Sequence, residues 1–319
     1  MLATFVFAST SFPVQATPAH QATSCSNPGW FPEQFGLKDH HVFWYGGYYY
    51  LVSIYVPLDD PSPFAEDRFA YARSKDLCKW EQLPFIPATR LPGASDVKAI
   101  WAPFVFQENG VFYMYYTSVT EAGTQKIRLA TTSDPSDPNN WQTTDMVFTP
   151  SHAGTIWQEG DWADCRDPML LKIGNAYYLY YTGADIAGGI IGLAIGATPA
   201  GPWYDFGPVV KAEPGQMLES PTLVPYDKSY FLFYNLASVG GYYRAGQSPT
   251  GPWQDPRPFR PGWAHEVWQD VDQVWRTSYL TNYTITISPL TWDDSFDPQL
   301  PWIGSSIFHD MLPLILRAK

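Results

Sequence analysis

The residues best suited to chemistry in this chain are three acids that stand at similar places in a repeated sequence phrase. Asp39 and Asp167 each begin one copy of the phrase, and Glu219 directly precedes the copy that begins at Ser220. If the copies are neighbouring inner strands, the three carboxyl groups lie within roughly 10 Å of one another. Carboxylates gathered in this way repel each other, which raises at least one pKa. One carboxyl group can then remain protonated as an acid while another is ionised as a base.

The phrase that carries these acids occurs five times. Each copy has a polar lead-in, a few apolar residues, a small turn and a burst of aromatic residues; the first reads DHHVFWYGGYYYLV. The copies start between 45 and 65 residues apart, at Asp39, Ala102, Asp167, Ser220 and His265. A repeat of this length built from strand pairs predicts the blades of a β-propeller. We therefore expect an all-β protein in which residues 17–319 form a single five-bladed β-propeller, with four-stranded antiparallel blades around a central channel.

Each copy continues with a third strand and then a tryptophan that opens the last strand. These tryptophans are Trp80, Trp141, Trp203, Trp253 and, in the fifth unit, Trp292. We expect them to pack between blades rather than to contact a ligand. The segments 17–37 and 299–319 lie outside the repeats, and either of them could supply a strand that closes the ring.

Composition limits the possible partners. The chain carries 19 basic and 31 acidic residues, a net charge of −12, and it has no basic stripe. Nucleic acids and anionic membrane surfaces are therefore poor partners. A neutral sugar fits better, because 14 Trp and 21 Tyr offer flat apolar faces to its C–H groups. An acidic surface that only keeps the protein soluble is an equally good interpretation.

The N-terminal segment and the cysteines bear on where the protein works. Residues 1–16 combine an apolar run with Val14 and Ala16 spaced as in a cleavage site, so we predict a signal peptide and a secreted or periplasmic protein. The run is too short to span a bilayer. Cys25, Cys78 and Cys165 cannot all pair within the chain, and we expect no disulfide framework, with Cys165 as a buried small apolar residue.

Four short motifs in this order resemble a known group of enzymes. They are an early Asp39, the triplet Arg166-Asp167-Pro168, the Glu-x-Pro of Glu219-Ser220-Pro221, and His265 in the fifth copy. Together they resemble the five-bladed glycoside hydrolases, above all family 43, which contains arabinofuranosidases, arabinanases and β-xylosidases. The phrase at 100–103, IWAP, is similar to the WAP motif of that family. The resemblance covers roughly residues 36 to 293.

The resemblance implies a role for each matching residue. Asp39 would be the general base that activates water, Asp167 would orient the sugar and tune its neighbour's pKa, and Glu219 would protonate the leaving oxygen. Arg166 would pair with a carboxylate or bind a sugar hydroxyl. His265 would contact the substrate, or it would bind a water or an ion such as a structural Ca²⁺ in the central channel. The resemblance implies no required cofactor. Such a set suits hydrolysis of a glycosidic bond through an oxocarbenium-like transition state.

Other residues compete for places in or near this site. Trp101, Trp44 and Trp162 could each form the floor of a sugar subsite, and Trp101 is the first choice because it borders the repeat.

Asp164 is the main rival of Asp167 for its role in the site, and the outside candidates for a catalytic acid are Asp96 and Glu266. If its segment is a regular strand, Glu266 should face away from His265. His40 and His41 follow Asp39 where the family usually has proline, and only one of the two can face the channel. Each acid could also simply cap backbone amides in a turn.

Two further hypotheses remain open. The same Arg-Asp-Pro and Glu-x-Pro motifs resemble families 32 and 68, the fructosidases and fructosyltransferases, in which the first aspartate is a nucleophile and configuration is retained. Retention requires carboxyl groups about 5–5.5 Å apart, and inversion requires about 6.5–9.5 Å. The first copy lacks the Asn-Asp-Pro-Asn-Gly run of fructosidases, which favours an inverting enzyme acting on furanose- or xylose-containing glycans. The third hypothesis is a propeller that binds sugar without turnover.

Overall fold

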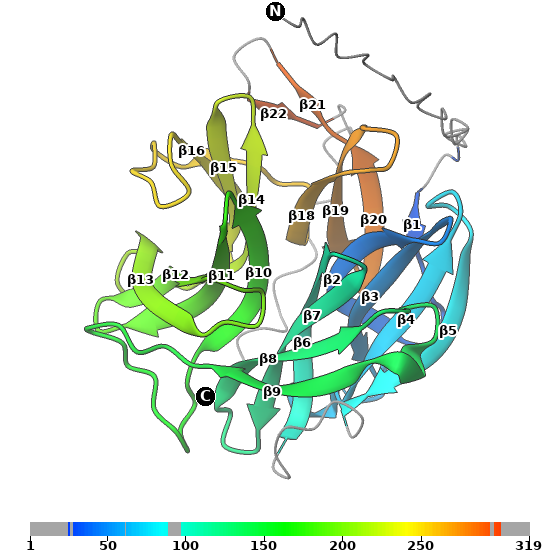
Figure 1. Cartoon of the computed structure of the whole chain (residues 1–319), viewed down its shortest axis with the longest axis horizontal. Helices are drawn as coiled ribbons and strands as arrows, with labels where there is room; N and C mark the ends of the chain where they lie inside the picture. The colour runs from blue at the N-terminus through cyan, green and yellow to red at the C-terminus, as the bar shows by residue number, and fades with distance from the viewer. Residues whose placement is uncertain (1–24, 26–27, 61, 89–96, 294–296, 301–319) are drawn as a thin grey trace, which may run out of the picture.

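The computed structural model describes residues 25, 28–60, 62–88, 97–293 and 297–300. The predicted signal peptide and the outside candidate Asp96 lie outside this range. The described chain forms five four-stranded antiparallel sheets, which stand side by side around a centre (Figure 1). Their innermost strands follow one another round the ring, and the fifth returns to the first. The predicted five-bladed β-propeller is confirmed.

Each blade takes its innermost strand first in the chain. Blade I consists of β2 (Gly36–Tyr45), β3 (Tyr48–Val56), β4 (Arg68–Ser74) and β5 (Trp80–Pro87), and blade II of β6 (Val97–Glu108), β7 (Val111–Thr120), β8 (Gln125–Thr132) and β9 (Gln142–Phe148). Blade III consists of β10 (Cys165–Ile173), β11 (Ala176–Asp185), β12 (Gly188–Gly196) and β13 (Trp203–Lys211), and blade IV of β14 (Leu218–Tyr226), β15 (Ser229–Leu236), β16 (Gly240–Gly246) and β17 (Arg257–Pro258). Blade V consists of β18 (Trp263–Gln269), β19 (Trp275–Thr281), β20 (Thr284–Pro289) and β1 (Gly29–Trp30). Two 3₁₀ turns, η1 (Pro63–Ala65) and η3 (Pro138–Asn140), and a small sheet of β21 (Thr291–Trp292) and β22 (Pro298–Gln299) complete the described elements.

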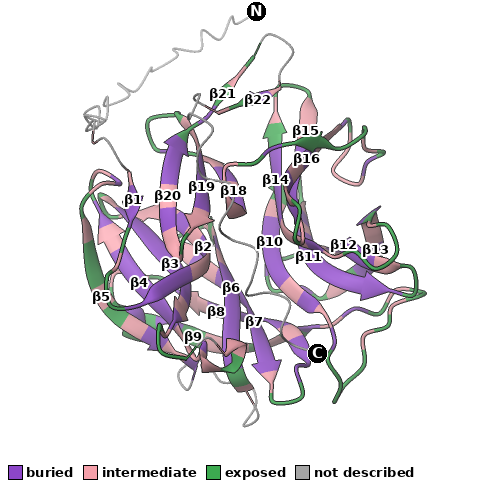
Figure 2. Cartoon of the chain, turned by 180° about the vertical axis from the view of Figure 1, so that it is seen from behind, coloured by how far each residue is buried: buried purple, intermediate pink, exposed green. Residues whose placement is uncertain are grey.

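The aromatic bursts form the second strand of the blades, which is buried on both faces between neighbouring sheets. Buried residues follow the inner strands, while exposed residues gather in loops and on outer strands such as β5 (Figure 2). Buried tyrosine hydroxyls need hydrogen-bond partners. Three of them find an equivalent partner, a proline carbonyl in the turn before the last strand of the next blade: Tyr71 to Pro135, Tyr115 to Pro199, and Tyr180 to Pro249. These bonds fix how each blade packs on the next.

The N-terminal segment supplies the strand that closes the ring. Strand β1 pairs with β20 as the outermost strand of blade V. The same segment is also tied to blade I, because the Gly29 amide donates to the carbonyl of Leu77 at 2.9 Å. The fifth unit therefore takes its last strand from the other end of the chain. For that reason Trp292 does not open the last strand of blade V, as we expected, but lies in the small β21–β22 sheet. Its ring packs against Tyr226 of blade IV and Trp275 of blade V, so the expected packing between blades is confirmed.

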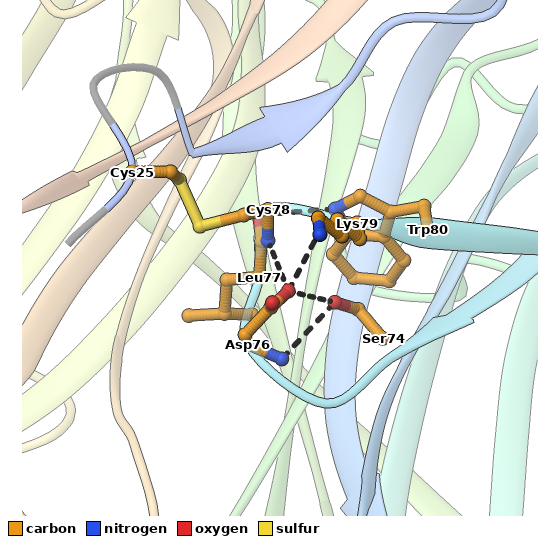
Figure 3. The surroundings of a disulfide bond; sticks show 7 residues. All are labelled: Cys25, Ser74, Asp76, Leu77, Cys78, Lys79 and Trp80. Atoms are coloured by element: carbon orange, nitrogen blue, oxygen red, sulfur yellow. Dashed lines mark hydrogen bonds between the residues drawn. A yellow bond between two sulfur atoms is a disulfide. The ribbon is translucent and has the colours of Figure 1, made fainter. Parts of the chain in front are cut away.

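A disulfide between Cys25 and Cys78 fastens the closing segment to the turn between β4 and β5 (Figure 3). The turn is well ordered, because the Asp76 carboxylate accepts hydrogen bonds from the amides of Cys78 and Lys79. Our expectation of no disulfide framework is corrected here, because an odd number of cysteines still leaves room for one pair. Cys165 is free and buried, as predicted.

The disulfide should contribute measurably to stability. It links residues 53 positions apart, and closing a loop of that size is worth about 2–4 kcal/mol. We expect the Cys25→Ser/Cys78→Ser variant to lose this amount of unfolding free energy in urea titrations. Reductant should destabilise the wild type to the same extent and leave the variant unchanged. Identical unfolding midpoints for the two proteins would contradict the assignment.

Candidate active site

A β-bulge in every innermost strand builds the site. In each blade, two consecutive residues of the first strand stand opposite a single residue of the second strand. The five bulges are 38–39, 102–103, 167–168, 220–221 and 264–265. In four of them the first residue has a φ between 45° and 55°. Bulges bend a strand and re-aim its side chains, and here all five do so at the same level of the ring.

The bulges correct the predicted alignment of the repeats. The first bulge residue is Lys38 in blade I and Ala264 in blade V, so Asp39 and His265 each stand one position later than the repeated phrase implied. Asp167 is the first residue of its bulge, and Glu219 is the residue just before one. The three acids thus occupy three different positions of one recurring feature, and this places their side chains at different points around the channel.

Bulge residues from all five blades line a cavity on the propeller axis. Asp39, Asp167 and His265 are among its walls, and Glu219 adjoins it through Ser220. The cavity offers about 30 Å³ to water-sized molecules, which is room for about two waters. A sugar ring does not fit into this space, so a glycan would have to bind at the mouth, above the carboxylates.

Ser220 connects the two aspartates. Its amide donates to Asp167 Oδ2 at 2.9 Å, and its hydroxyl donates to Asp39 Oδ1 at 3.3 Å. Asp167 Oδ2 also accepts the hydroxyl of Thr182 at 2.9 Å. Because Glu219 directly precedes Ser220, the three acids lie together, as we predicted from the repeat.

Arg166 holds the other side of the acid cluster. Its Nη2 donates to Glu219 Oε1 at 2.8 Å, and its Nε lies 3.8 Å from Asp167 Oδ2. Its Nη1 contacts Asp164 and donates to Gln125 Oε1 at 3.2 Å. The predicted pairing of Arg166 with carboxylates is present in the structure, and Asp164 stands outside the cavity wall as a partner of this guanidinium. Charge-assisted bonds of this kind fix carboxylate orientation.

Burial and mutual repulsion change the proton affinity of the aspartates. Burial is the main cause that raises the pKa of Asp39, and the charge of Glu219 adds to it. Burial also raises the pKa of Asp167 to about 7, where Arg166 opposes the shift and the charges of Asp39 and Glu219 increase it. The cluster therefore binds a proton more tightly than isolated carboxylates would near neutral pH.

This proton affinity should be visible in stability. Since the folded pKa of Asp167 exceeds its unfolded value, the folded state binds the extra proton, and stability falls as pH rises from about 4 to 7. We expect Asp167→Asn to gain stability relative to wild type across this window, by on the order of 1 kcal/mol or more at its upper end. Thermal unfolding at several pH values measures this, with exposed Asp255→Asn as the control. A stability difference that does not vary with pH would contradict the raised pKa.

Sequence reasoning missed a second charged pair beside Asp39. Lys38 contacts the buried carboxylate of Glu66, which follows the η1 turn. The Lys38 ammonium lowers the pKa of Asp39, whereas the Glu66 charge raises it. The Glu66 carbonyl also accepts the amide of Ile100 and so ties this pair to blade II. The only signal in the sequence was the position of Lys38 next to Asp39, because Glu66 lies outside the repeated phrase.

The histidines stand on the inner wall of the ring. His265 is fully buried, neither of its ring nitrogens makes a hydrogen bond of normal geometry, and burial lowers its pKa to about 3. His40 Nε2 contacts Ser278 Oγ at 2.8 Å, and His41 Nδ1 pairs with Glu266 at 2.9 Å. Glu266 lines the cavity together with His265, so the expectation that it faces away is wrong. The bulge at 264–265 breaks the strand alternation on which that expectation depended.

The donors at His265 do not fit a calcium cage. Ca²⁺ takes six to eight oxygen ligands, and His265 offers an uncharged imidazole. Among the described residues, no group of three or more His, Cys, Asp or Glu side chains is arranged to hold a metal ion. Calcium in the channel therefore stays a prediction, and no step below depends on it.

The structure separates the three predicted tryptophans. Trp44 lies five residues beyond Asp39, about 16 Å along β2, and packs against Tyr49 beside the hairpin turn. Nothing in the described structure brings Trp44 to the acid cluster, and its contact with sugar stays a prediction. Trp101 occupies the position before the blade II bulge but is only 8% exposed, with its indole N–H bonded to the Pro63 carbonyl at 3.3 Å. Trp162 is the exposed member of the set.

Comparison with known proteins shows the family and the fold of this chain. The sequence model of the family described as "Glycosyl hydrolases family 32 N-terminal domain" matches residues 40–248. The chain belongs to this family. An extracellular endo-α-(1→5)-L-arabinanase of Thermotoga petrophila is 27% identical over 220 residues, which is 58% of this chain and 46% of that protein. The chain thus spans about half the length of the curated relative that it matches.

Solved structures of family 43 enzymes share the fold of this family 32 member. A thermostable family 43 glycoside hydrolase has a TM-score of 0.64 at 18% identity, over 87% of this chain and 96% of its own. An arabinanase of Bacillus subtilis has the same TM-score and identity, over 82% of this chain and 97% of its own. A β-xylosidase/α-arabinofuranosidase from a compost metagenome, solved with xylotriose, has a TM-score of 0.64 at 14% identity, over 86% and 98%. The predicted family 43-like propeller, related also to family 32, is confirmed.

Proposed function

We propose that the protein is a glycosidase that hydrolyses furanose- or xylose-containing oligosaccharides and polysaccharides by acid–base catalysis. The observation that carries the proposal is the meeting of Asp39, Asp167 and Glu219 at the axial cavity, joined by Ser220 and Arg166. Family membership and the arabinanase relative support the reaction class. The acidic surface and the absence of a basic stripe favour a carbohydrate partner over nucleic acid or membrane.

In the proposed mechanism each acid has one task. Glu219 gives its proton to the glycosidic oxygen as the bond to the anomeric carbon breaks. Asp39 takes a proton from a water, whose oxygen forms the new bond on the opposite face of the sugar, so configuration inverts. The raised pKa of Asp39 makes it a stronger base once ionised. Asp167, held by hydrogen bonds from Ser220 and Thr182, orients the sugar.

The second candidate is a retaining fructan-active enzyme, and the family 32 match favours it. In that case Asp39 attacks the anomeric carbon, and water later releases the covalent sugar. The third candidate, a sugar-binding propeller without turnover, would bind sugar at the same place.

Since disulfides persist in oxidising compartments, the Cys25–Cys78 bond supports export of the protein, together with the extracellular relative. No helix in the described part of the chain has the length and apolar character to cross a bilayer.

One experiment separates these candidates. The protein is incubated with aryl arabinofuranosides, aryl xylosides, arabinan and sucrose, and proton NMR follows the anomer that forms first. We expect cleavage of a furanoside or xyloside with inverted configuration. Retained configuration with sucrose as the best substrate would favour the second candidate. Binding without cleavage of any compound would leave only the third.

A further inference from the structure

The loop between β9 and β10 presents an exposed tryptophan beside the site. Residues 149–164 run from blade II to the start of the innermost strand of blade III. Trp162 in this loop is 53% exposed and stands five positions before Asp167. An exposed tryptophan this close in the chain to a proposed sugar site is a candidate contact for a sugar ring, because an indole offers a flat apolar face.

The loop is fixed at Trp162 rather than free to move. The Thr124 hydroxyl donates to the Asp161 carbonyl at 2.8 Å, and the Gln125 amide donates to the Ala163 carbonyl at 3.1 Å. Thr124 and Ala163 form a parallel β-bridge, so the loop lies along the hairpin of β7 and β8 like an added strand. Because the backbone on both sides of Trp162 is already held, little backbone entropy is lost when its side chain binds a ligand.

One side of the indole rests on Gly123 at the tip of that hairpin. A Cβ added to Gly123 would lie 2.4 Å from Trp162 Cε3, so only glycine leaves room for the ring there. Gly123 also has a φ of +84°, which glycine adopts without strain. With one side supported and about half of its surface exposed, the ring offers a flat apolar platform at a fixed place.

The platform points to the same side as the acid cluster. Along 162–166, burial alternates: Ala163 and Cys165 are buried, while Trp162, Asp164 and Arg166 are not. In an extended segment such alternation places Trp162, Asp164 and Arg166 on one face. Arg166 contacts Glu219. Trp162 stands four residues before Arg166, which is about 13 Å along an extended chain.

We propose that Trp162 forms a distal subsite that stacks against a sugar ring of a glycan chain, beyond the sugar whose bond is cleaved. This inference rests on the proposed glycosidase function and deepens it, since it assigns oligosaccharides and polysaccharides, not simple glycosides, as the preferred substrates. The C–H face of a sugar covers the indole as another apolar surface would. Short substrates that end at the cleaved bond do not reach the platform.

The test compares long and short substrates in the Trp162→Ala variant. For the best cleaved member among arabino-, xylo- and fructo-oligosaccharides, we expect KM to rise about tenfold from the lost apolar contact, with kcat nearly unchanged. For the matching aryl monoglycoside, kcat/KM should stay within about twofold of wild type. Trp162→Phe should restore most of the oligosaccharide KM. An equal loss on both substrates would overturn the subsite.

A matched control and a binding measurement complete the test. Tyr204 is 70% exposed at the start of β13, on the outer edge of blade III, and Tyr204→Ala should leave both KM values unchanged. Calorimetric titration measures the affinity for the three oligosaccharides even if none of them is cleaved. A complete lack of cleavage would refute the proposed function but would leave this test of the subsite intact. Equal affinity of wild type and Trp162→Ala for every oligosaccharide, or no binding by either, would overturn the subsite independently of catalysis.

Discussion

Replacing Glu219 with glutamine is expected to reduce kcat on unactivated glycosides by about 10²–10⁴-fold, because the leaving oxygen loses its proton donor. The amide can still accept the hydrogen bond from Arg166, so the mouth should keep its shape. Steady-state hydrolysis measures kcat, and calorimetry on the same variant should show that oligosaccharide binding persists. Turnover at the wild-type rate would rule out Glu219 as the acid.

The control for this variant is Glu213→Gln. Glu213 is exposed and lies in the loop just before β14, six residues from Glu219. The Glu213→Gln substitution makes the same chemical change away from the acid cluster, so activity should remain at the wild-type level. A comparable loss in this control would show that the effect of Glu219→Gln comes from general charge removal rather than from proton transfer.

Replacing Asp39 with asparagine is expected to reduce kcat by a similar factor, about 10²–10⁴, since the proposed base that deprotonates the attacking water is lost. Asparagine keeps an oxygen for the Ser220 hydroxyl. Its charge is lost, however, and with it the repulsion that raises the pKa of Asp167. The pKa of Asp167 should therefore fall, which carboxyl NMR titration of the variant can measure.

Exposed Asp59→Asn in the same blade serves as the control for Asp39→Asn, and it should change neither kcat nor the titration of Asp167. If Asp39→Asn hydrolyses glycosides as fast as the wild type, Asp39 is neither base nor nucleophile. An Asp167 titration that does not move would show that the two carboxyl groups do not interact through the cavity.

The sequence was sufficient to predict the blades because each blade repeats the same physical pattern. A polar lead-in, an apolar strand, a turn and an aromatic strand recur five times, and stacked sheets are the arrangement that buries such strands on both faces. The acids could be found for the same reason: they stand at the start of the repeats. Their partners Arg166 and Ser220 were visible as chain neighbours.

The parts that could not be predicted depend on contacts between distant segments. Positive φ usually favours Gly or Asn, but the bulges use Ala102, Asp167, Ser220 and Ala264, so no residue type marked the change of register. The pairing of Cys25 with Cys78 depends on the path of β1, which belongs to blade V although it comes first in the chain. Glu66 joins the site from a loop of the same blade, outside the repeats.

The most direct test of the central claim, that Glu219 and Asp39 act as acid and base at one channel mouth, is the dependence of each variant on the leaving group. Aryl glycosides that release dinitrophenolate need no proton on the departing oxygen, whereas alkyl glycosides do. The account predicts that Glu219→Gln recovers nearly wild-type rates on the dinitrophenyl substrate and stays inactive on the alkyl one, while Asp39→Asn is slow on both. The account would be contradicted if Asp39→Asn, and not Glu219→Gln, regained activity on the dinitrophenyl substrate. It would also be contradicted if neither variant regained activity on that substrate.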